Sequence, residues 1–268
     1  MQIPVNAFKQ ALKNQKPQIG LWVGLADAYA AELIASTGFD WLCIDAEHAP
    51  NDPRSVLRQL QSVAPYAVHP VVRPLHGTTE TIKQYLDIGA QTILVPMIET
   101  AEQAALVVAA TRYPTRGNRG VGSALARASR WNQIEGYLER CDGEICVLVQ
   151  VESAAALRNL ESIAAVPGVD GVFFGPADLS ASMGLLGKPQ HPEVQNAIAV
   201  GISTVVKAGK AAGSLTSDIQ TARGYLAQGA TFVAVGVDTS LLVKAAAQLV
   251  AAFADGSARR PLNSDAVY

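Results

Sequence analysis

Residues 145–178 read ICVLVQVESAAALRNLESIAAVPGVDGVFFGPAD, a stretch in which an apolar strand-like run, a helical segment and a second apolar run follow one another. A carboxylate follows each apolar run, Glu152 after the first and Asp178 after the second, and the two are 178 − 152 = 26 residues apart. That spacing is about one strand-plus-helix unit, and in a closed barrel of such units consecutive strand ends lie side by side at one rim. Two carboxylates meeting there suit a hard divalent cation that keeps open positions for water and substrate. The alternative is that both are solvated loop acids.

The same alternation extends over the whole chain of 268 residues. Apolar runs predict eight strands, at Ile19–Leu25, Trp41–Asp45, Pro70–Arg73, Thr92–Met97, Ile145–Val151, Gly171–Phe174, Gly213–Thr216 and Phe232–Val237. Helical patterns follow them, at Asp27–Thr37, Pro53–Val63, Thr79–Ile88, Ala101–Arg112, Ser153–Ala165, about His191–Ala212, Asp218–Gln228 and Ser240–Ala254. Near-continuous apolar strands indicate a parallel sheet covered on both faces, and eight units favour closure. We therefore predict an α/β fold, one (β/α)8 TIM-barrel domain over residues 1–268, with a surface C-terminal arm from about residue 257.

Composition limits the kinds of partner. The chain is 49% hydrophobic and 16% charged, and its net charge of −2 gives no electrostatic basis for binding nucleic acid or an anionic membrane. No apolar run approaches the roughly 20 residues of a spanning helix, and the N-terminus lacks the apolar core of a secretory signal. The three cysteines lack metal-type spacing and are expected to be buried thiols. We expect a cytoplasmic protein whose partners are small molecules.

Polar residues at the carboxyl ends of the predicted strands are where a barrel enzyme carries its chemistry. These positions hold acids, one histidine, one arginine and one glutamine: Asp45, Glu47, His48, Arg73, Glu99, Gln150, Glu152, Asp178 and Asp238. No lysine falls at a strand end, so a Schiff-base mechanism has no candidate amine. The chain also has no Gly-rich dinucleotide fingerprint and no P-loop, so we expect no nucleotide cofactor. Carbonyl chemistry here would rely on a metal ion as Lewis acid.

Four of these residues have the chemistry that removal of a proton next to a carbonyl needs. His48 is the natural general base, and Asp45, three residues earlier, is within reach to fix its tautomer; an exposed loop histidine is the alternative. Arg73 ends an apolar strand, so its guanidinium is expected to hold a carboxylate or an enolate oxygen, unless it forms a rim salt bridge. Gln150 shares a strand face with Glu152 and contacts substrate or a metal-bound water, or is a core amide.

Two further stretches bear on ligand binding. Gly175 and Pro176 set a tight turn, and the backbone N–H groups that follow it, from Ala177 onward, are placed to receive a substrate carboxylate. Residues 113–130 are rich in Gly and Arg and are too long for a simple helix-to-strand connection. We expect them to form an anion-binding or subunit-contact loop close to the active rim, with disorder as the alternative.

Several motifs, in order along the chain, resemble the HpcH/HpaI aldolase family. They are Trp22-Val23-Gly24, Asp45-Ala46-Glu47-His48-Ala49-Pro50, Pro70-Val71-Val72-Arg73-Pro74, Leu94-Val95-Pro96-Met97, Arg119-Gly120-Val121-Gly122, Ser123-Ala124-Leu125-Ala126-Arg127-Ala128-Ser129-Arg130-Trp131, Gln150-Val151-Glu152 and Gly175-Pro176-Ala177-Asp178-Leu179-Ser180. The resemblance runs from about Phe8 to Ala254 and implies a barrel of the phosphoenolpyruvate/pyruvate superfamily. It also implies a homohexamer, a trimer of dimers that exchange the last helix.

The resemblance further implies a class II aldolase, a divalent-metal-dependent carbon–carbon lyase. Such an enzyme reversibly cleaves 4-hydroxy-2-oxo acids, such as 4-hydroxy-2-oxoheptanedioate, to pyruvate and an aldehyde (here succinic semialdehyde) through a metal-bound pyruvate enolate. By position, the resemblance implies that Glu152 and Asp178 bind the metal ion, Mg, Mn or Co. It implies a base at His48 with Asp45 as its partner acid, an arginine at Arg73 that stabilises the enolate, and an acid at Asp87 that lies near the base at a subunit contact. The substrate contacts that it implies are Gln150, Ala177, Asp178, Trp22 and Leu215.

The acceptor half of the substrate stays open. Residues 213–218 depart from the family pattern around the seventh strand, so aldolases for sugar-derived 2-keto-3-deoxy acids remain an alternative. A distal carboxylate on the aldehyde requires a further cation, for which Arg127 is a candidate. A citrate-lyase-β-like lyase acting on CoA thioesters is the second alternative, with the arginine-rich loop meeting a CoA phosphate.

Overall fold

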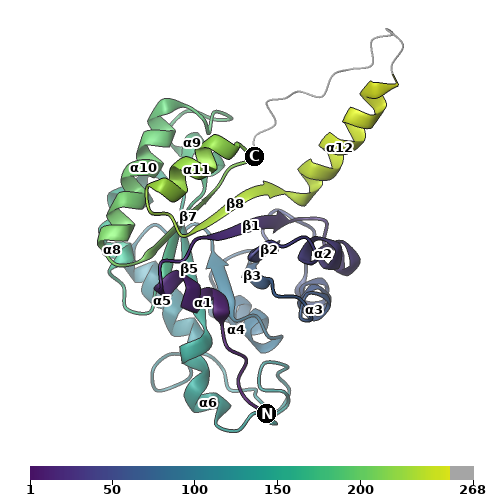
Figure 1. The fold of residues 1–268 in the computed structure, drawn as a ribbon. Coiled ribbons are helices and arrows are strands. Elements are labelled where there is room, and N and C mark those ends of the chain that lie inside the picture. Colours follow the sequence, from purple (N-terminus) through teal and green to yellow (C-terminus); the bar gives the residue numbers. More distant parts are fainter. Residues whose placement is uncertain (254–268) are drawn as a thin grey trace.

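The computed structural model describes residues 1–253 of the protein. The chain folds into the predicted barrel (Figure 1). Eight parallel strands close in the order β1-β2-β3-β4-β5-β6-β7-β8, with β8 paired to β1. Their bounds are β1 Gln18–Val23, β2 Trp41–Asp45, β3 His69–Arg73, β4 Thr92–Val95, β5 Cys146–Val151, β6 Gly171–Phe174, β7 Ala211–Leu215 and β8 Phe232–Val237. The prediction of a (β/α)8 fold is confirmed.

Helices surround the barrel and return the chain from the carboxyl end of one strand to the amino end of the next. Their bounds are α1 Ala7–Lys13, α2 Ala28–Ala35, α3 Pro53–Ser62, α4 Thr79–Asp87, α5 Ala101–Thr111, α6 Tyr137–Arg140, the 3₁₀ turn η1 Cys141–Glu144, α7 Ala154–Arg158, α8 Leu160–Ala164, α9 Pro176–Ser182, α10 Pro192–Lys207, α11 Ile219–Ala227 and α12 Asp238–Ala252. The helix predicted up to Ala212 ends at Lys207, because Gly209 takes a left-handed conformation and Ala211 already belongs to β7.

Aromatic side chains fill the inside of the barrel. Trp41, Phe173 and Phe232 pack together, with the Trp41 and Phe173 rings each 6.0 Å from that of Phe232. Gly20 makes room for them, because a Cβ at that position would overlap the indole ring of Trp41. Phe8 of α1 adds to the same cluster, with its ring 5.8 Å from that of Trp41. This packing fills the interior of the barrel, so the space for a ligand lies at the carboxyl ends of the strands.

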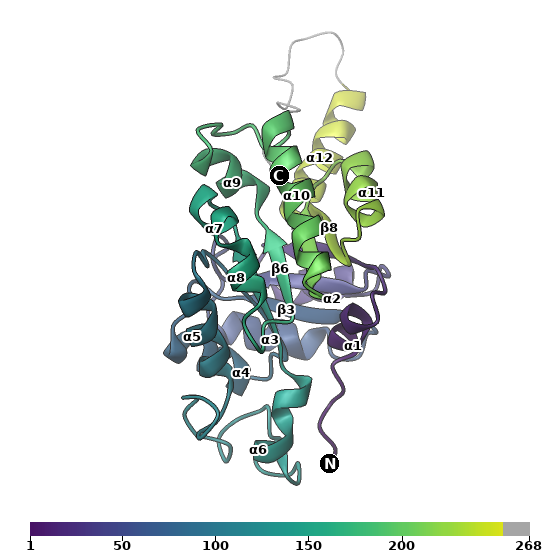
Figure 2. The ribbon, with the colours of Figure 1, turned by 90° about the vertical axis from the view of Figure 1, so that its left-hand side faces the viewer.

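The segment between α5 and β5 lies at the amino ends of the strands, at the opposite end of the molecule from α12 (Figure 2). Arg119 in this segment is fully buried, and its Nη2 donates to Asp87 Oδ1 at 2.7 Å. Arg127 Nη1 donates to the backbone oxygen of Ile88 at 3.0 Å. The expectation that this loop lies near the active rim of its own barrel is wrong, because the connection from a helix to the next strand returns the chain to the other rim.

Helix α12 leaves the barrel and projects away from it (Figure 1), and Asp238 is its one buried residue. Its exposed apolar side chains are Leu241, Leu242, Val243, Leu249 and Val250. In the single chain this helix therefore presents a row of large apolar side chains to solvent. The predicted C-terminal arm from about residue 257 lies outside the described residues. Among residues 1–253, no helix combines the length and apolarity needed to cross a bilayer.

Candidate active site

A cavity of about 60 Å³ opens at the carboxyl ends of the strands. Its lining residues are Trp22, His48, Arg73, Gln150, Glu152, Phe173, Gly175, Pro176, Ala177, Asp178, Pro189, Gln190, Leu215 and Thr216. Eight of the residues predicted from the sequence are in this set, contributed by segments from β1 to β7. The space corresponds to about four to six water molecules, enough for a ligand of a few heavy atoms.

Glu152 lies deepest among the acids of this pocket, with 3% of its surface exposed. Its Oε1 accepts a hydrogen bond from the Met97 backbone N–H at 2.8 Å, and its Oε2 accepts one from Gln150 Nε2 at 2.6 Å. Gly175 is required beside it, because a Cβ there would overlap the Glu152 carboxylate. Burial is the main cause that raises the pKa of Glu152 to about 7; the Glu47 and Asp178 carboxylates act in the same direction, and the Met97 hydrogen bond acts against them. A negative charge on Glu152 is therefore energetically unfavourable in this pocket.

Arg73 is a fixed cation between two carboxylates. Its Nε and Nη2 donate to Asp45 at 2.8 and 2.7 Å, and its Nη1 lies 2.8 Å from Glu47 Oε2. The guanidinium carbon also lies 5.2 Å from the centre of the Trp22 ring. Burial by itself would lower the pKa of Arg73, but the hydrogen bonds and charges of Asp45 and Glu47 raise it above its usual value. The side chain is therefore charged and held in one orientation.

The surroundings of His48 differ from those expected. Its side chain is 54% exposed, and its Nε2 lies 3.9 Å from Glu47 Oε2. Asp45 instead faces Arg73, because the register of β2 on β3 pairs these two residues directly. Asp45 also accepts the Glu47 backbone N–H at 3.0 Å. The acid beside His48 in this chain is thus Glu47, a strand-end residue without a predicted role, whose pKa burial raises.

Two buried acceptor atoms near Glu152 have no hydrogen-bond partner. They are Gln150 Oε1 and Glu47 Oε2, the latter in ionic contact with Arg73 Nη1 and 3.9 Å from His48 Nε2. Leaving such groups without donors costs about 1–3 kcal/mol each, so the site is built to receive donors from a ligand or from water. Among residues 1–253, no set of three or more His, Cys, Asp and Glu side chains is arranged as a metal site. Glu152 and Asp178 are the two carboxylates among the residues that line the pocket.

The opposite side of the pocket carries a short helix and an apolar wall. α9 begins at Pro176 with no side chain capping its first turn, which contains Ala177 and Asp178. The wall contains Leu215 and Thr216, and Thr216 Oγ1 lies 3.5 Å from Gln190 Nε2. Gln190 is not at a strand end. It reaches the pocket from the loop between α9 and α10, so no strand-end pattern in the sequence identifies it.

Asp87 and the candidate Arg127 lie far from this pocket in their own chain. Asp87 ends α4, five residues before β4 begins, and so lies at the amino ends of the strands. Its carboxylate is paired with Arg119, and Asp87 does not line the cavity.

The profile of the HpcH/HpaI aldolase/citrate lyase family matches residues 18–245. The chain belongs to the HpcH/HpaI aldolase family. This aldolase is 59% identical over 268 residues, all of both chains, to a hydroxypyruvate/pyruvate aldolase of Pseudomonas aeruginosa. It is 57% identical over 263 residues to a 4-hydroxy-2-oxo-heptane-1,7-dioate aldolase of Klebsiella pneumoniae, which covers 98% of this chain and 99% of that protein. The resemblance read from the motifs is confirmed.

Solved structures agree with this assignment. The crystal structure of an HpcH/HpaI aldolase/citrate lyase family protein from Burkholderia cenocepacia is 41% identical to this aldolase, with a TM-score of 0.89, covering 92% of this chain and 99% of that one. The protein is therefore an aldolase, a lyase of carbon–carbon bonds, built on a (β/α)8 barrel.

Proposed function

We propose that this HpcH/HpaI aldolase is a divalent-metal-dependent pyruvate aldolase, which reversibly cleaves 4-hydroxy-2-oxo acids to pyruvate and an aldehyde. The observation that carries the proposal is the pair of carboxylates, Glu152 and Asp178, in one small pocket with the fixed guanidinium of Arg73. The names of its relatives support the substrate class, with 4-hydroxy-2-oxoheptanedioate as the first candidate. The name hydroxypyruvate/pyruvate aldolase adds hydroxypyruvate as a second candidate for the nucleophilic half.

The residues present fit a hard divalent cation, Mg, Mn or Co. Glu152 and Asp178 would hold it, since oxygen donors suit such ions, and a cation would offset the burial and the neighbouring carboxylates that raise the pKa of Glu152. Gln150 Oε1 and Glu47 Oε2 have free acceptor capacity for water molecules around it. When bound, the cation supplies Lewis acidity at the oxygens of the 2-oxo acid.

Arg73 acts where negative charge develops. As the bond between C3 and C4 of the substrate breaks, its electron pair moves towards the oxygen on C2, giving the enolate of pyruvate. A guanidinium already held by Asp45 and Glu47 stabilises that charge without having to reorient. The support for this role is the geometry of the three side chains.

His48 is proposed to move the protons. In cleavage it takes the proton of the C4 hydroxyl as the aldehyde forms, and in synthesis it removes a methyl proton of pyruvate. Its partial exposure supports the role, because the imidazole can exchange its proton with solvent between turnovers. Glu47, 3.9 Å away, is the acid in this chain that can orient the imidazole.

The remaining pocket residues divide between the two halves of the substrate. We assign the carboxylate of the pyruvyl half to the uncapped first turn of α9, at Ala177 and Asp178, with Gln150 as a further hydrogen-bonding group. The aldehyde half is assigned to the part of the pocket lined by the apolar side chains of Trp22 and Leu215. Arg127, which lies at the other rim, makes no contribution to this pocket within its own chain.

The proposal includes the assembly and the location. A cytoplasmic homohexamer, a trimer of dimers that exchange α12, would cover the apolar side chains of that helix. Asp87 would then act in a neighbouring subunit, near its His48. The surface beside Asp87 supports this role, because Val121 and Leu125 of the adjoining loop are 64% and 89% exposed.

Pyruvate release from a panel of 4-hydroxy-2-oxo acids tests the proposal, with 4-hydroxy-2-oxoheptanedioate and sugar-derived 2-keto-3-deoxy acids in parallel. We expect EDTA to abolish activity and added Mn or Mg to restore it. Borohydride with pyruvate should trap no covalent adduct, and trapping one would overturn the metal-dependent account. Malyl-CoA serves as the comparison substrate. If the enzyme preferred to cleave the carbon–carbon bond of this CoA thioester, it would belong with the CoA-dependent lyases of its superfamily.

A further inference from the structure

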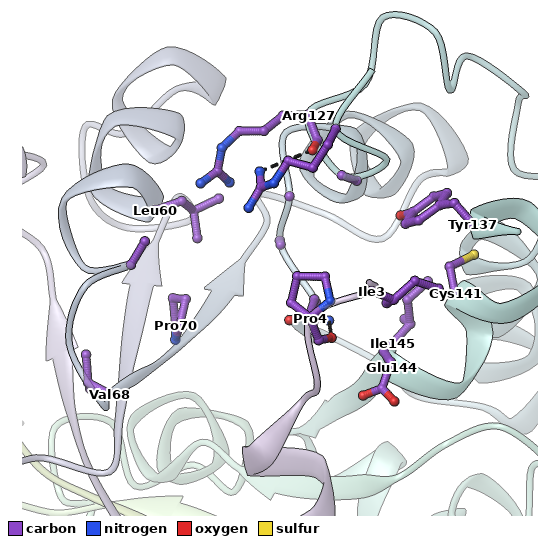
Figure 3. A pocket seen from close by; sticks show the side chains of 16 residues that line it. Ile3, Pro4, Leu60, Val68, Pro70, Arg127, Tyr137, Cys141, Glu144 and Ile145 are labelled. Carbon is purple, nitrogen blue, oxygen red and sulfur yellow. Dashed lines mark hydrogen bonds between the residues drawn. The ribbon is translucent and has the colours of Figure 1, made fainter. Parts of the chain in front are cut away.

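A second cavity, of about 240 Å³, lies at the amino ends of the strands (Figure 3). Arg127 lies over one end of it, with Leu60, Val68 and Pro70 along one side. The other side is formed by Ile3, Pro4 and Ile145. None of its lining residues belongs to the active-site pocket, and the aromatic core of the barrel separates the two.

Two arginines of this cavity lack acidic partners. Arg127 Nη1 donates to the Ile88 backbone oxygen at 3.0 Å, and Arg130 Nη1 donates to the Arg127 backbone oxygen at 3.3 Å. Within residues 1–253, neither side chain forms an ion pair. Three other arginines in this part of the chain do have acidic partners. Arg112 and Arg116 pair with Asp142, and Arg119 pairs with Asp87.

Keeping two unpaired guanidinium groups side by side is unfavourable without a ligand. Both arginines are half-buried, and burial together with the charge of Arg130 lowers the pKa of Arg127. Glu144 is the one carboxylate among the lining residues; it forms no ion pair with either arginine, and its Oε2 accepts the Asn6 backbone N–H at 2.6 Å. The cavity therefore combines a cationic end with apolar walls.

We propose that this cavity binds a small organic carboxylate with an aliphatic body. Arg127 and Arg130 receive the carboxylate, since the planar N–H forks of guanidinium groups match its two oxygens. The aliphatic part lies between Leu60, Val68 and Pro70 on one side and Ile3 and Ile145 on the other. The apolar walls favour such a ligand over inorganic phosphate, which would leave them in contact with water. This site goes beyond the proposed function and does not depend on it.

Titration calorimetry on the full-length protein tests the site, with hexanoate as the probe and a buffer free of phosphate and carboxylates. We expect hexanoate to bind, 1-hexanol to bind far more weakly, and Arg130→Gln to weaken hexanoate about tenfold or more through loss of a charge-assisted contact. Ala64→Phe, at an exposed lining position, should block the cavity without touching either arginine. Arg223→Gln, an exposed arginine on α11, is the matched control and should leave binding unchanged.

The active-site variant Glu152→Gln separates the two sites, because hexanoate binding at the second cavity should persist in it. Three results would overturn the proposal: no heat with hexanoate, full binding in Arg130→Gln, or loss of binding in Glu152→Gln. Inorganic phosphate that binds as tightly as hexanoate would overturn the ligand class, leaving a simple anion site. Circular dichroism of each variant confirms that it is folded before its titration is interpreted.

Discussion

Replacing Glu152 with glutamine should stabilise the metal-free protein at alkaline pH. The substitution keeps the size of the side chain and removes its charge. In the folded protein, burial raises the pKa of Glu152 to about 7 from the ordinary 4.5. Because the folded pKa is the higher one, ionisation is harder in the folded state. Stability is therefore greatest below pH 4.5, is lost as the pH rises towards 7, and stays reduced above that.

The magnitude follows from the same two values. A difference of about 2.5 units, at 1.36 kcal/mol per unit, gives a penalty of about 3 kcal/mol at pH 8 and about 1 kcal/mol at pH 5. Glu152→Gln removes this penalty, and a flip of the Gln150 amide lets its unpartnered Oε1 accept the new N–H. We expect the variant to exceed the wild type in unfolding free energy by up to about 3 kcal/mol at pH 8 and by much less at pH 5.

Urea unfolding in EDTA, followed by tryptophan fluorescence at the two pH values, measures the difference. Glu161→Gln on the exposed face of α8 is the control and should show no pH-dependent gain. Equal stability of Glu152→Gln and wild type at pH 8, or a larger gain at pH 5, would show that ionised Glu152 does not destabilise the folded protein. The same variant should lose most of its aldolase activity, since a neutral amide is a poor ligand for a divalent cation.

Three further substitutions have defined outcomes. Arg73→Lys should lower kcat about 10²–10³-fold, because lysine cannot make the paired contact with Asp45; steady-state kinetics with near-normal kcat would remove Arg73 from its role. Gly20→Ala should destabilise the fold by about 1–3 kcal/mol or more, since its Cβ overlaps Trp41, and an unchanged urea midpoint would contradict this packing. Burial lowers the pKa of His69 to about 4, so stability should fall as the pH drops from 6.5 towards 4, and His69→Gln should show a shallower loss over that range.

The barrel and the residues at its active rim could be predicted because they depend on local pattern. Alternating apolar runs and helical segments fix where each strand ends, and closure brings those ends together. Glu152, Asp178, Arg73 and Gln150 therefore lie in one pocket, as expected from their positions at or just beyond the carboxyl ends of strands. The missing strand-end lysine was equally visible in the sequence. The family motifs added the aldolase assignment, which the relatives confirm.

The partners of these residues were decided by tertiary structure. Asp45 was expected to orient His48 because it lies three residues away, but strand register places it against Arg73, and Glu47 takes the place beside His48. Gln190 reaches the pocket from a loop whose path no local pattern encodes.

The arginine-rich loop shows the same division between sequence and structure. Its composition indicated an anion-binding or contact segment, while the direction of the chain after α5 placed it at the opposite rim. Local patterns along the chain specify which side chains end strands, since strand ends depend on residues close in sequence. Register, loop path and the burial of charge decided which side chains meet, because each depends on residues distant in sequence.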